Sequence, residues 1–375
     1  MKVQILQENL NKGLTIASRS ISSKAQLPIL GNVLIKTDKN RLQISATNLE
    51  TGITLWLGAK VEEEGEITIP AKVFSEVIAS LPAGKIDLSE KENILNLSSD
   101  GYKASFNGIS ASEFPKLPTY SSDNLISLPS EKILEAINQV AFAAATDEGR
   151  PVLTGVLFKL QGKELSLVAT DGYRLSLKTV ELENTVKEEL SLLLPAKTLL
   201  EVGRIIGEES GETKIIQMGF TKDQNQVVFV FPESTLFSRV IEGEFPDYTK
   251  IIPQGATTKA QIDKESFNKA VKVVSIFARD SSNIIKLKLA KNLLEMSANS
   301  PQVGENINSI EQKLEGEESE IAFNFRFLLG FLSAISSPEV SLETTGPLNP
   351  GVFKGVGDNS FLHIIMPVRL QTEES

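Results

Sequence analysis

The sequence has no cysteine and only one histidine, His363. Without cysteine the chain can form no disulfide, no thiolate zinc site and no cysteine nucleophile. A single histidine rules out metal sites built from several histidines. It allows a Ser-His-Asp triad only if His363 itself takes part. These absences exclude several of the commonest catalytic and metal-binding arrangements.

Long apolar runs are also missing. The longest stretch without Asp, Glu, Lys or Arg covers residues 327–338. A helix of that length spans about 18 Å, well short of a ~30 Å hydrocarbon core. Residues 1–14 carry charges at Lys2, Glu8 and Lys12 and contain no apolar run, which is not the pattern of a signal peptide. We therefore expect a soluble cytoplasmic protein.

The overall composition is that of a globular protein. The chain has 375 residues, of which 41% are hydrophobic and 23% are charged. At about 150 residues per domain, this length predicts two or three domains. The formal net charge is −10, and an acidic chain is on average a poor match for nucleic acid.

Three parts of the sequence resemble one another. The segment IPAKVF at 69–74 matches LPAKTL at 194–199, and FNFRFL at 323–328 is a weaker third copy. Each follows a run typical of a β-strand and begins an apolar helix. Pro70 and Pro195 lie at the predicted helix starts, where a missing N–H costs little.

A second predicted helix precedes each of these segments. Its apolar residues recur at spacings of 4, 3 and 4, which is typical of one face of an amphipathic helix. Ser130 and Asp263 are the expected N-caps of the second and third copies. The stripes are Leu10, Leu14, Ala17 and Ile21; Ile133, Ile137, Val140 and Ala144; and Phe267, Val271, Val274 and Ala278.

The repeats define the predicted fold. Strand-like runs with alternating apolar residues follow each first helix, and each third ends on a strand. Proline-containing connectors at 114–118 and 245–248 mark the borders. We predict an α+β protein of three domains, 1–118, 119–249 and 250–375, each with two helices on a mainly antiparallel sheet. Chance similarity is the alternative, and three coincident stripes, second helices and closing strands argue against it.

Charge is unevenly distributed between helices and the rest of the chain. The six predicted helices, 7–24, 71–80, 129–146, 196–206, 263–280 and 324–335, contain twelve basic and eight acidic residues. The remaining residues contain 26 basic and 40 acidic ones. Lys72, Lys197 and Arg326 occupy equivalent positions. Lysines often do no more than keep an exposed helix face hydrated. The separation of charge between the helices and the rest of the chain instead favours a helical face that makes weak contacts with phosphates.

Four segments, in register along the whole chain, resemble the bacterial sliding clamps, the β subunits of DNA polymerase III holoenzyme. They are LPILGN at 27–32, ATDGYRL at 169–175, FPDY at 245–248 and MPVRL at 366–370. The resemblance implies a head-to-tail homodimeric ring of six domains around duplex DNA, with helices inside and sheet outside. It implies no catalytic residue, metal or cofactor, because such a ring tethers a polymerase and makes synthesis processive.

The resemblance also implies a partner-peptide pocket shared by the central and last domains. Its expected partners are the polymerase III catalytic subunit, the clamp loader, and other polymerases and repair proteins that carry short linear motifs. Tyr173 stands where the family commonly has histidine, and an acidic tail, 371–375, follows the last pocket residue. The implied pocket residues are Leu153, Thr170, Gly172, Tyr173, Arg174, Leu175, Pro246, Ile251, Ile364, Met366, Pro367, Val368, Arg369 and Leu370.

Two further surfaces follow from the ring. The dimer contact implied by the resemblance joins Ala104 and Phe106 of the first domain to Ile276 and Phe277 of the third. Ala104 replaces a larger apolar residue usual in the family. The expected DNA-binding residues are Lys12, Arg19, Lys24, Lys72, Lys132, Lys197, Arg204, Lys269, Lys272 and Arg326.

Two other functions remain open from the sequence. A carboxylate-dependent hydrolase, such as a glycoside hydrolase, needs only an Asp/Glu pair, and the chain has 48 acidic residues. An acidic scaffold ring that never touches DNA would have the same repeats. Activity on sugars would support the hydrolase, and salt-dependent DNA association separates the clamp from the scaffold.

Overall fold

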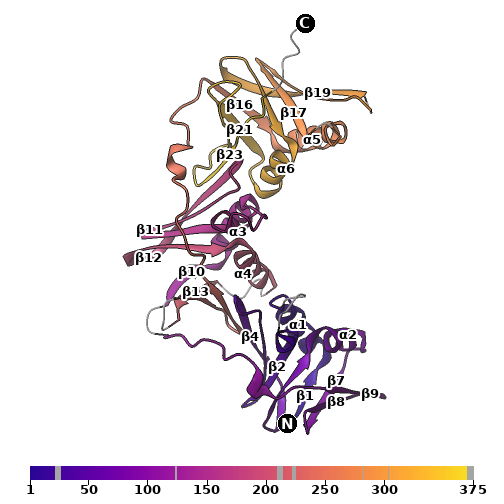
Figure 1. Cartoon of the computed structure of the whole chain (residues 1–375). Helices are drawn as coiled ribbons and strands as arrows, with labels where there is room; N and C mark the ends of the chain where they lie inside the picture. The colour runs from indigo at the N-terminus through magenta and orange to yellow at the C-terminus, as the bar shows by residue number, and fades with distance from the viewer. Residues whose placement is uncertain are drawn as a thin grey trace. The chain divides into compact units, whose positions relative to one another are not determined.

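One order of elements recurs three times along the chain (Figure 1). The computed structural model describes residues 1–21, 27–122, 125–208, 214–221, 225–280, 282–302 and 304–369. The first repeat contains β1 (Lys2–Leu6), α1 (Gln7–Ser18), η1 (Pro28–Gly31), β2 (Asn32–Asp38), β3 (Arg41–Thr47), β4 (Thr51–Gly58), β5 (Lys60–Glu63), β6 (Glu66–Pro70), α2 (Ala71–Ser80), β7 (Lys85–Lys91), β8 (Ile94–Ser99), β9 (Tyr102–Asn107) and η2 (Ala111–Glu113).

The second and third repeats follow the same plan, with longer strands in the second. The second contains β10 (Ile126–Pro129), α3 (Ser130–Val140), η3 (Ala141–Ala143), η4 (Pro151–Thr154), β11 (Gly155–Thr170), β12 (Arg174–Pro195), α4 (Ala196–Glu208), β13 (Ile215–Phe220), β14 (Gln226–Val230), β15 (Ser234–Arg239) and η5 (Tyr248–Lys250). The third contains β16 (Thr258–Asp263), α5 (Lys264–Ala278), β17 (Ile284–Ala290), β18 (Leu293–Ser300), β19 (Gly304–Gly316), β20 (Ser319–Asn324), α6 (Phe325–Ala334), β21 (Glu339–Thr344), β22 (Gly351–Gly355) and β23 (Phe361–Ile365).

The residues of the predicted apolar stripes lie in the hydrophobic core. Eleven of the twelve stripe residues are buried. The exception is Ile21, which follows the end of α1 and is half-buried. The prediction of three amphipathic first helices is therefore confirmed, but α1 ends at Ser18 and α3 at Val140, earlier than the predicted ranges 7–24 and 129–146.

The two predicted N-caps have different outcomes. Asp263 caps α5, because its side chain accepts a hydrogen bond from the Ser266 N–H. Hydrogen bonds from Ser266 also hold the pKa of the Asp263 carboxyl below its usual value. The Ser130 prediction was wrong: α3 begins at Ser130 itself, and its buried hydroxyl has no hydrogen-bond partner among the described residues. The strand β10 continues to Pro129, which leaves Ser130 inside the first turn.

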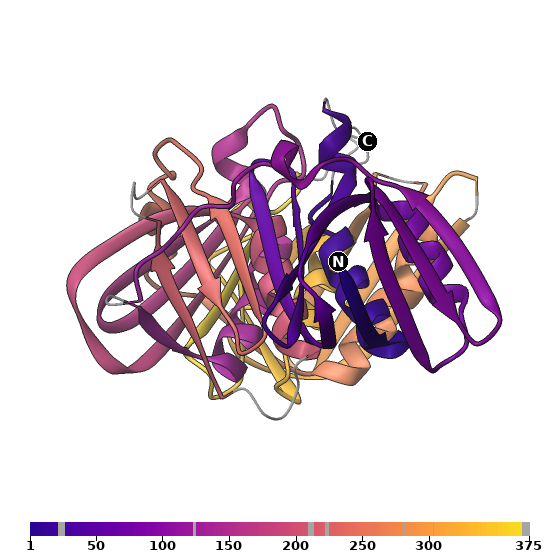
Figure 2. The same cartoon turned by 90° about the horizontal axis from the view of Figure 1, so that it is seen from below.

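The chain divides into two parts, each built on antiparallel sheets. The first part, Met1–Ser130 with Arg204–Val240, holds a five-stranded sheet in the order β5-β1-β7-β8-β9 and an eight-stranded sheet in the order β10-β13-β14-β15-β4-β3-β2-β6. In the first part α1 packs beside α2 (Figures 1 and 2). The second part, Glu131–Gly203 with Ile241–Ser375, holds ten strands in the order β11-β12-β23-β22-β21-β16-β19-β18-β17-β20. The predicted α+β fold with mainly antiparallel sheets is confirmed.

Candidate functional site

Each internal boundary between repeats is spanned by a pair of antiparallel strands. In the first part β4 pairs with β15, and Gly52 lies opposite Phe237. In the second part β12 pairs with β23, and Leu175 lies opposite Ile364. We call these strand pairs the first junction and the second junction. They are equivalent positions of the repeat, so their side chains can be compared one by one.

Side chains alternate between two faces along the strands of each junction. In the second junction Lys178 points toward α3, and its Nζ donates to Glu135 Oε1 at 3.0 Å. Residues on that side form the helix face. Leu175 and Leu177 point to the opposite side, which we call the outer face.

A tight turn leads into the second junction from β11. Thr170 Oγ1 donates to the Arg174 carbonyl at 2.6 Å and accepts from the Gly172 N–H at 3.0 Å. Asp171 Oδ1 accepts from the N–H groups of Tyr173 and Arg174 at 2.9 and 3.0 Å. Gly172 has φ +92°, which glycine adopts without steric strain. The hairpin turn predicted from Asp171-Gly172 is confirmed.

The Arg174 side chain points away from the outer face. Its Nε donates to Asp171 Oδ2 at 3.0 Å, and its Nη2 donates to the Phe142 carbonyl at 2.7 Å. The guanidinium lies 5.3 Å from the ring centroid of Phe142 and 4.8 Å from that of Phe327. These cation–π contacts and charged hydrogen bonds hold the turn in place from the helix face. Arg174 therefore acts as a positioning residue for the turn.

The outer face of the second junction is apolar. Val168, Leu175, Val352, Leu362 and Ile364 form a buried cluster there. Partly buried side chains packed against this cluster are Leu157, Leu177, Phe245, Tyr248 and Ile252. Large apolar side chains remain exposed beside it, with Tyr173 at 62%, Met366 at 39% and Ile251 at 38%. The Met366 N–H donates to the Tyr173 carbonyl at 2.8 Å, which joins the last segment of the chain to the turn.

Seven of the expected pocket residues lie in the turn, on the paired strands or in the segment bonded to the turn: Thr170, Gly172, Tyr173, Arg174, Leu175, Ile364 and Met366. Val368 instead donates its N–H to the Ala322 carbonyl of β20 at 2.8 Å. The expected pocket residues differ in burial. The buried ones are Thr170, Leu175 and Ile364, and the half-buried ones are Leu153, Arg174, Pro367 and Val368. The exposed ones are Gly172, Tyr173, Pro246, Ile251, Met366 and Arg369. Leu370 and the acidic tail, 371–375, lie outside the described residues.

Sequence reasoning missed several contributors to this region. Arg150 approaches the turn, because its Nη1 lies 3.4 Å from the position a Cβ on Gly172 would take. Phe142 and Phe327 hold Arg174 but lie far from it in sequence. Arg150 precedes η4, Phe142 is in η3 and Phe327 is in α6, so tertiary packing of these helices against the turn brings them together. A comparison of equivalent repeat positions could have indicated the apolar cluster.

His363 lies on the helix face of the second junction, directly opposite Ser176. Ser176 Oγ and His363 Nδ1 share a hydrogen bond of 2.7 Å. The imidazole is 0% exposed and packs between the rings of Phe142 and Phe331, at 5.3 and 5.6 Å. Burial, with a smaller effect of the Arg174 charge, lowers the pKa of His363 to about 3. The residue is a neutral structural histidine, and no described residue completes a catalytic triad with it.

The expected DNA-binding residues differ in how far they are engaged within the chain. Arg19 pairs with Glu208 at 2.5 Å, and Lys269 pairs with Glu265 at 2.6 Å. Lys132 donates to the Glu181 carbonyl at 3.3 Å, and the exposed Lys197 lies 3.8 Å from Glu148. Arg204 also has an interaction partner. Lys24 lies outside the described residues.

Four of the expected basic residues have no carboxylate partner in the described part of the chain. They are Lys12, Lys72, Lys272 and Arg326, and all four are exposed on helices. Their ammonium and guanidinium groups are exposed to solvent and available to an external anion.

The expected dimer residues lie in two different settings. Phe106 is only 8% exposed, and its ring contacts that of Phe74 edge-on at 5.1 Å. Ala104 is half-buried on the same edge strand, β9. Ile276 on α5 is 52% exposed, whereas Phe277 packs against the core of the third repeat. Of these four side chains, Ile276 offers the largest free apolar surface.

The described residues contain no group of three or more His, Cys, Asp or Glu side chains that could hold a metal ion. In the same part of the chain, none of the helices has the length and hydrophobicity of a membrane-spanning segment.

Comparisons with known proteins identify the family of this chain. Models of the N-terminal, central and C-terminal domains of the DNA polymerase III beta subunit match residues 1–118, 127–247 and 249–369. The beta sliding clamp of Synechococcus elongatus is 30% identical, covering 99% of this chain and 100% of the relative. That of Bacillus subtilis is 29% identical, covering 98% of this chain and all of the relative.

Solved structures agree with these matches. The sliding clamp crystal structure from Bacillus subtilis has a TM-score of 0.92 at 28% identity and covers 99% of both chains. A Pseudomonas aeruginosa sliding clamp bound to griselimycin has a TM-score of 0.92 at 25% identity, covering 99% of this chain and 100% of the other. Neither the hydrolase nor the DNA-free scaffold is supported by any of these matches. The chain belongs to the DNA polymerase III beta subunit family, the bacterial beta sliding clamps.

Proposed function

We propose that two copies of this chain close head to tail into a ring around duplex DNA. The ring tethers the DNA polymerase III catalytic subunit, and the clamp loader and other polymerases and repair proteins bind it through short linear motifs. The role is non-catalytic, as in the sliding clamp family. The proposed domains are 1–118, 119–249 and 250–375.

The observation that carries this proposal is the use of strand edges in the repeat. In each repeat one strand has an edge that can pair with the last strand of another repeat. In this way β4 pairs with β15, and β12 pairs with β23. The third such strand is β19, whose residues 304–311 pair only with β18. The third last strand is β9, which pairs only with β8. Two edges of matching kind thus remain within the described residues, and unpaired edges favour strand addition.

Exposed apolar side chains accompany both free edges. Tyr102 on β9 is 54% exposed, and Val73 on the neighbouring helix α2 is 54% exposed. Ile307 on β19 is 57% exposed, and Ile276 on α5, which packs on β19, is 52% exposed. Pairing β9 of one chain with β19 of another would cover all four. A heterologous contact of this kind closes a ring when the rotation per chain allows it.

The DNA contact is proposed to depend on the helix residues that have no internal partner. Lys12, Lys72, Lys272 and Arg326 belong to helices of the first and third repeats. Phosphate contacts by such residues give affinity without sequence preference, which suits a clamp that slides. Arg19 and Lys269 must give up ion pairs with carboxylates to reach a phosphate, so we assign them smaller contributions.

The peptide pocket is proposed on the outer face of the second junction because the first junction lacks the same chemistry. Val168, Leu177 and Leu362 of the second junction correspond to Ser45, Thr54 and Thr235 of the first. Ser45 and Thr54 share a hydrogen bond of 3.0 Å, so their hydroxyls satisfy each other. Apolar anchors of a peptide would gain little there.

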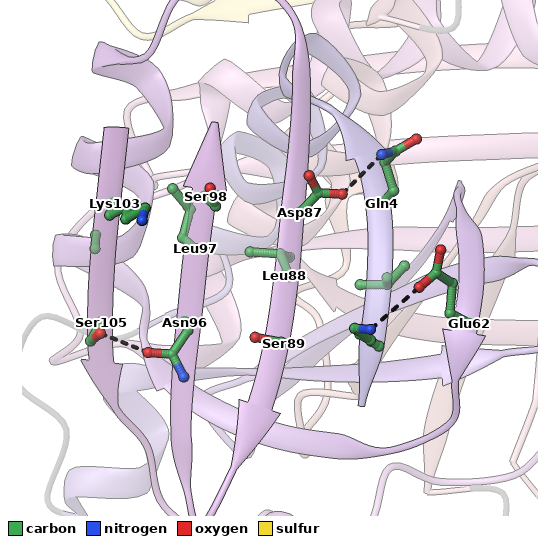
Figure 3. Close-up of a pocket in the computed structure, with 13 residues that line it drawn as sticks. Gln4, Glu62, Asp87, Leu88, Ser89, Asn96, Leu97, Ser98, Lys103 and Ser105 are labelled. Atoms are coloured by element: carbon green, nitrogen blue, oxygen red, sulfur yellow. Dashed lines mark hydrogen bonds and ion pairs between the residues drawn. The ribbon is translucent and has the colours of Figure 1, made fainter. Parts of the chain in front are cut away.

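The outer face beside the free edge β9 is also polar. A hollow of about 320 Å³ lies over β1, β7, β8 and β9. Gln4 Nε2 donates to Asp87 Oδ1 at 2.9 Å, and Ser105 Oγ donates to Asn96 Oδ1 at 2.8 Å (Figure 3). Of the three positions considered, the second junction alone combines an apolar outer face with exposed apolar side chains. The proposal is therefore one peptide pocket per chain.

Solution mass tests the ring, and a labelled peptide tests the pocket. Light scattering at micromolar concentration should give roughly twice the chain mass of 40.9 kDa. A stable monomer or an open filament would contradict the ring. A fluorescent peptide with a glutamine, a leucine and an aromatic residue should bind once per chain, and deletion of 366–375 should abolish binding. Undiminished binding by a folded dimer of that deletion would place the pocket elsewhere.

A further inference from the structure

A cavity of about 800 Å³ lies on the helix face of the first junction. Its walls include Ile16 of α1, Leu55 and Leu57 of β4, and Ile205 and Ile215. All its lining residues belong to the first part of the chain. The volume falls within the range of small-molecule sites. The lining combines these apolar side chains with polar and charged ones, among them Asn9, Lys12 and Lys214.

The repeat shows how the side chains beside this cavity differ from those of the second junction. Lys178 and Phe361 are opposite one another in the second junction, and the corresponding opposite pair in the first is Leu55 and Ser234. Phe361 is 0% exposed, and its ring stacks on Phe331 at 6.0 Å. The serine at the equivalent position carries no ring, and it lines the cavity.

Two neighbouring positions show the same loss of rings. His363 of the second junction corresponds to Leu236 of the first, through its partner Ser176. Phe142, which packs on His363 at 5.3 Å, corresponds to Arg19 by the spacing of the helix stripes. Arg19 instead reaches Glu208 in an ion pair. Three aromatic positions of the second junction are therefore non-aromatic in the first.

Ser234 provides a second, independent observation. It lines the cavity and is 2% exposed. Its hydroxyl has no hydrogen-bond partner among the described residues. A buried polar atom without a partner costs free energy, and a ligand atom that bonds it would relieve that cost.

The charges around the cavity indicate the sign of the ligand. Lys12 and Lys214 line it and have no carboxylate partner in the residues that the structure describes. Of the two lining carboxylates, Glu208 is engaged by Arg19, which leaves Glu233. Two available ammonium groups against one carboxylate favour an anionic ligand.

We propose that this cavity binds a small aromatic carboxylate. The ring takes the space that Phe361 fills in the second junction, a polar atom bonds the Ser234 hydroxyl, and the carboxylate faces Lys12 and Lys214. The site is separate from the proposed peptide pocket and does not depend on the proposed function.

The test uses three probes with one ring system: indole-3-acetate, indole and tryptamine. Protein-observed NMR titration of the full-length chain should show indole-3-acetate shifting the methyl signals of Ile16 and Ile215. Indole should bind more weakly, and tryptamine weakest, because its ammonium meets two lysines. Equal binding of the anionic and cationic probes, or shifts only at the second junction, would overturn the proposal.

Two variants sharpen the result. Ser234→Phe restores the residue type of the second junction and should weaken indole-3-acetate binding by about tenfold or more, because the new ring fills the cavity. Lys214→Met keeps the cavity and should weaken indole-3-acetate while leaving indole unchanged. If Ser234→Phe does not fold, Lys214→Met still tests the proposal. An equal loss of affinity for indole-3-acetate and indole, or no loss for either probe, would refute the charge assignment. Undiminished binding to a folded Ser234→Phe would show that the ligand lies elsewhere.

Discussion

Ser176 Oγ and His363 Nδ1 lie 2.7 Å apart on opposite strands of the second junction. Their hydrogen bond lies on the helix face, on the opposite side of the strands from the proposed pocket. Leu175 and Ile364, next to them in sequence, point to that outer face. The same strand pair therefore joins two repeats and carries the proposed pocket.

The first prediction concerns pH. An unfolded histidine has a pKa of about 6.5, whereas burial lowers that of His363 to about 3. Above both values the residue is neutral in both states and adds no pH dependence. As pH falls from about 6.5 toward 3, only the unfolded chain gains this proton, so stability falls by up to ~1.4 kcal/mol per pH unit.

Urea unfolding of the parent and His363→Leu at several pH values between about 6.5 and 5 checks this expectation. Leucine is the residue at the equivalent position of the first junction, Leu236. The variant should be less stable near neutrality, because Ser176 loses its partner, but its stability should fall less steeply with acid. The same slope in both proteins would show that His363 is not the titrating group.

The second prediction concerns the ring. Ile276→Asp and Ile307→Asp should shift the population toward monomer, because each places a charge in a seam that pairing would desolvate. Sedimentation velocity measures the populations. Leu348→Asp is the matched control, since Leu348 is 58% exposed and lies on neither free edge. Substitution of Phe106 is a poorer test, because its ring packs on Phe74 within its own repeat.

If Leu348→Asp and Ile276→Asp lower the dimer population equally, the seam assignment is wrong. Retained helical circular dichroism in each variant separates dissociation from unfolding.

The third prediction concerns DNA. Lys12→Glu combined with Arg326→Glu should shorten retention on circular DNA more than Arg19→Glu does, because Arg19 is already paired with Glu208. The log of direct affinity should fall linearly with the log of salt concentration, with a smaller slope in the double variant. Lys91→Glu, at the exposed tip of the β7–β8 hairpin, is the control and should behave as the parent. A larger effect of Arg19→Glu than of the double variant would contradict the ranking.

The fourth prediction uses the first junction as a template. Leu177→Thr with Leu362→Thr introduces the residue types of Thr54 and Thr235, which the same sheet geometry already accepts. An aliphatic or aromatic peptide anchor gains roughly 1.5–3 kcal/mol by burial, and ordering the peptide offsets part of this. We expect a parent Kd of ~1 μM, about −8 kcal/mol, and at least tenfold weaker binding in the variant. Fluorescence polarisation measures both. Binding at parent strength by the folded variant would contradict the pocket.

The fifth prediction separates positioning from contact at Arg174. Arg174→Lys keeps the charge but loses the hydrogen bonds to Asp171 and to the Phe142 carbonyl. Peptide affinity should fall, and amide exchange of the turn should become faster in the absence of peptide. A loss of affinity without any change in turn exchange would mean that Arg174 contacts the peptide directly.

The fold was predictable because three amphipathic stripes and two proline-started helices repeat in the sequence. Asp263 acts as predicted, since a local hydrogen bond decides a cap. Ser130 does not, because strand β10 extends to the residue before it. Its position depends on pairing with β13, which lies far along the chain.

The site was predictable only in part, because side-chain direction depends on strand register. Thr170 to Leu175 were identified as a group, but alternation sends Leu175 to the outer face and Arg174 toward Phe142 and Phe327. Ion pairs between distant parts of the chain could not be predicted from the sequence either. Arg19 and Lys12 look alike in sequence, yet only Arg19 meets a carboxylate, Glu208, from another repeat.

Retention on DNA of different topology tests the central claim most directly. The protein is loaded onto nicked circular DNA, the DNA is cut once, and bound protein is followed over time. The account predicts slow loss from the circle and rapid loss after cutting, because a closed ring slides off a free end. Ile276→Asp should be lost rapidly from both. Equal retention on circular and cut DNA would contradict a ring that encircles the duplex.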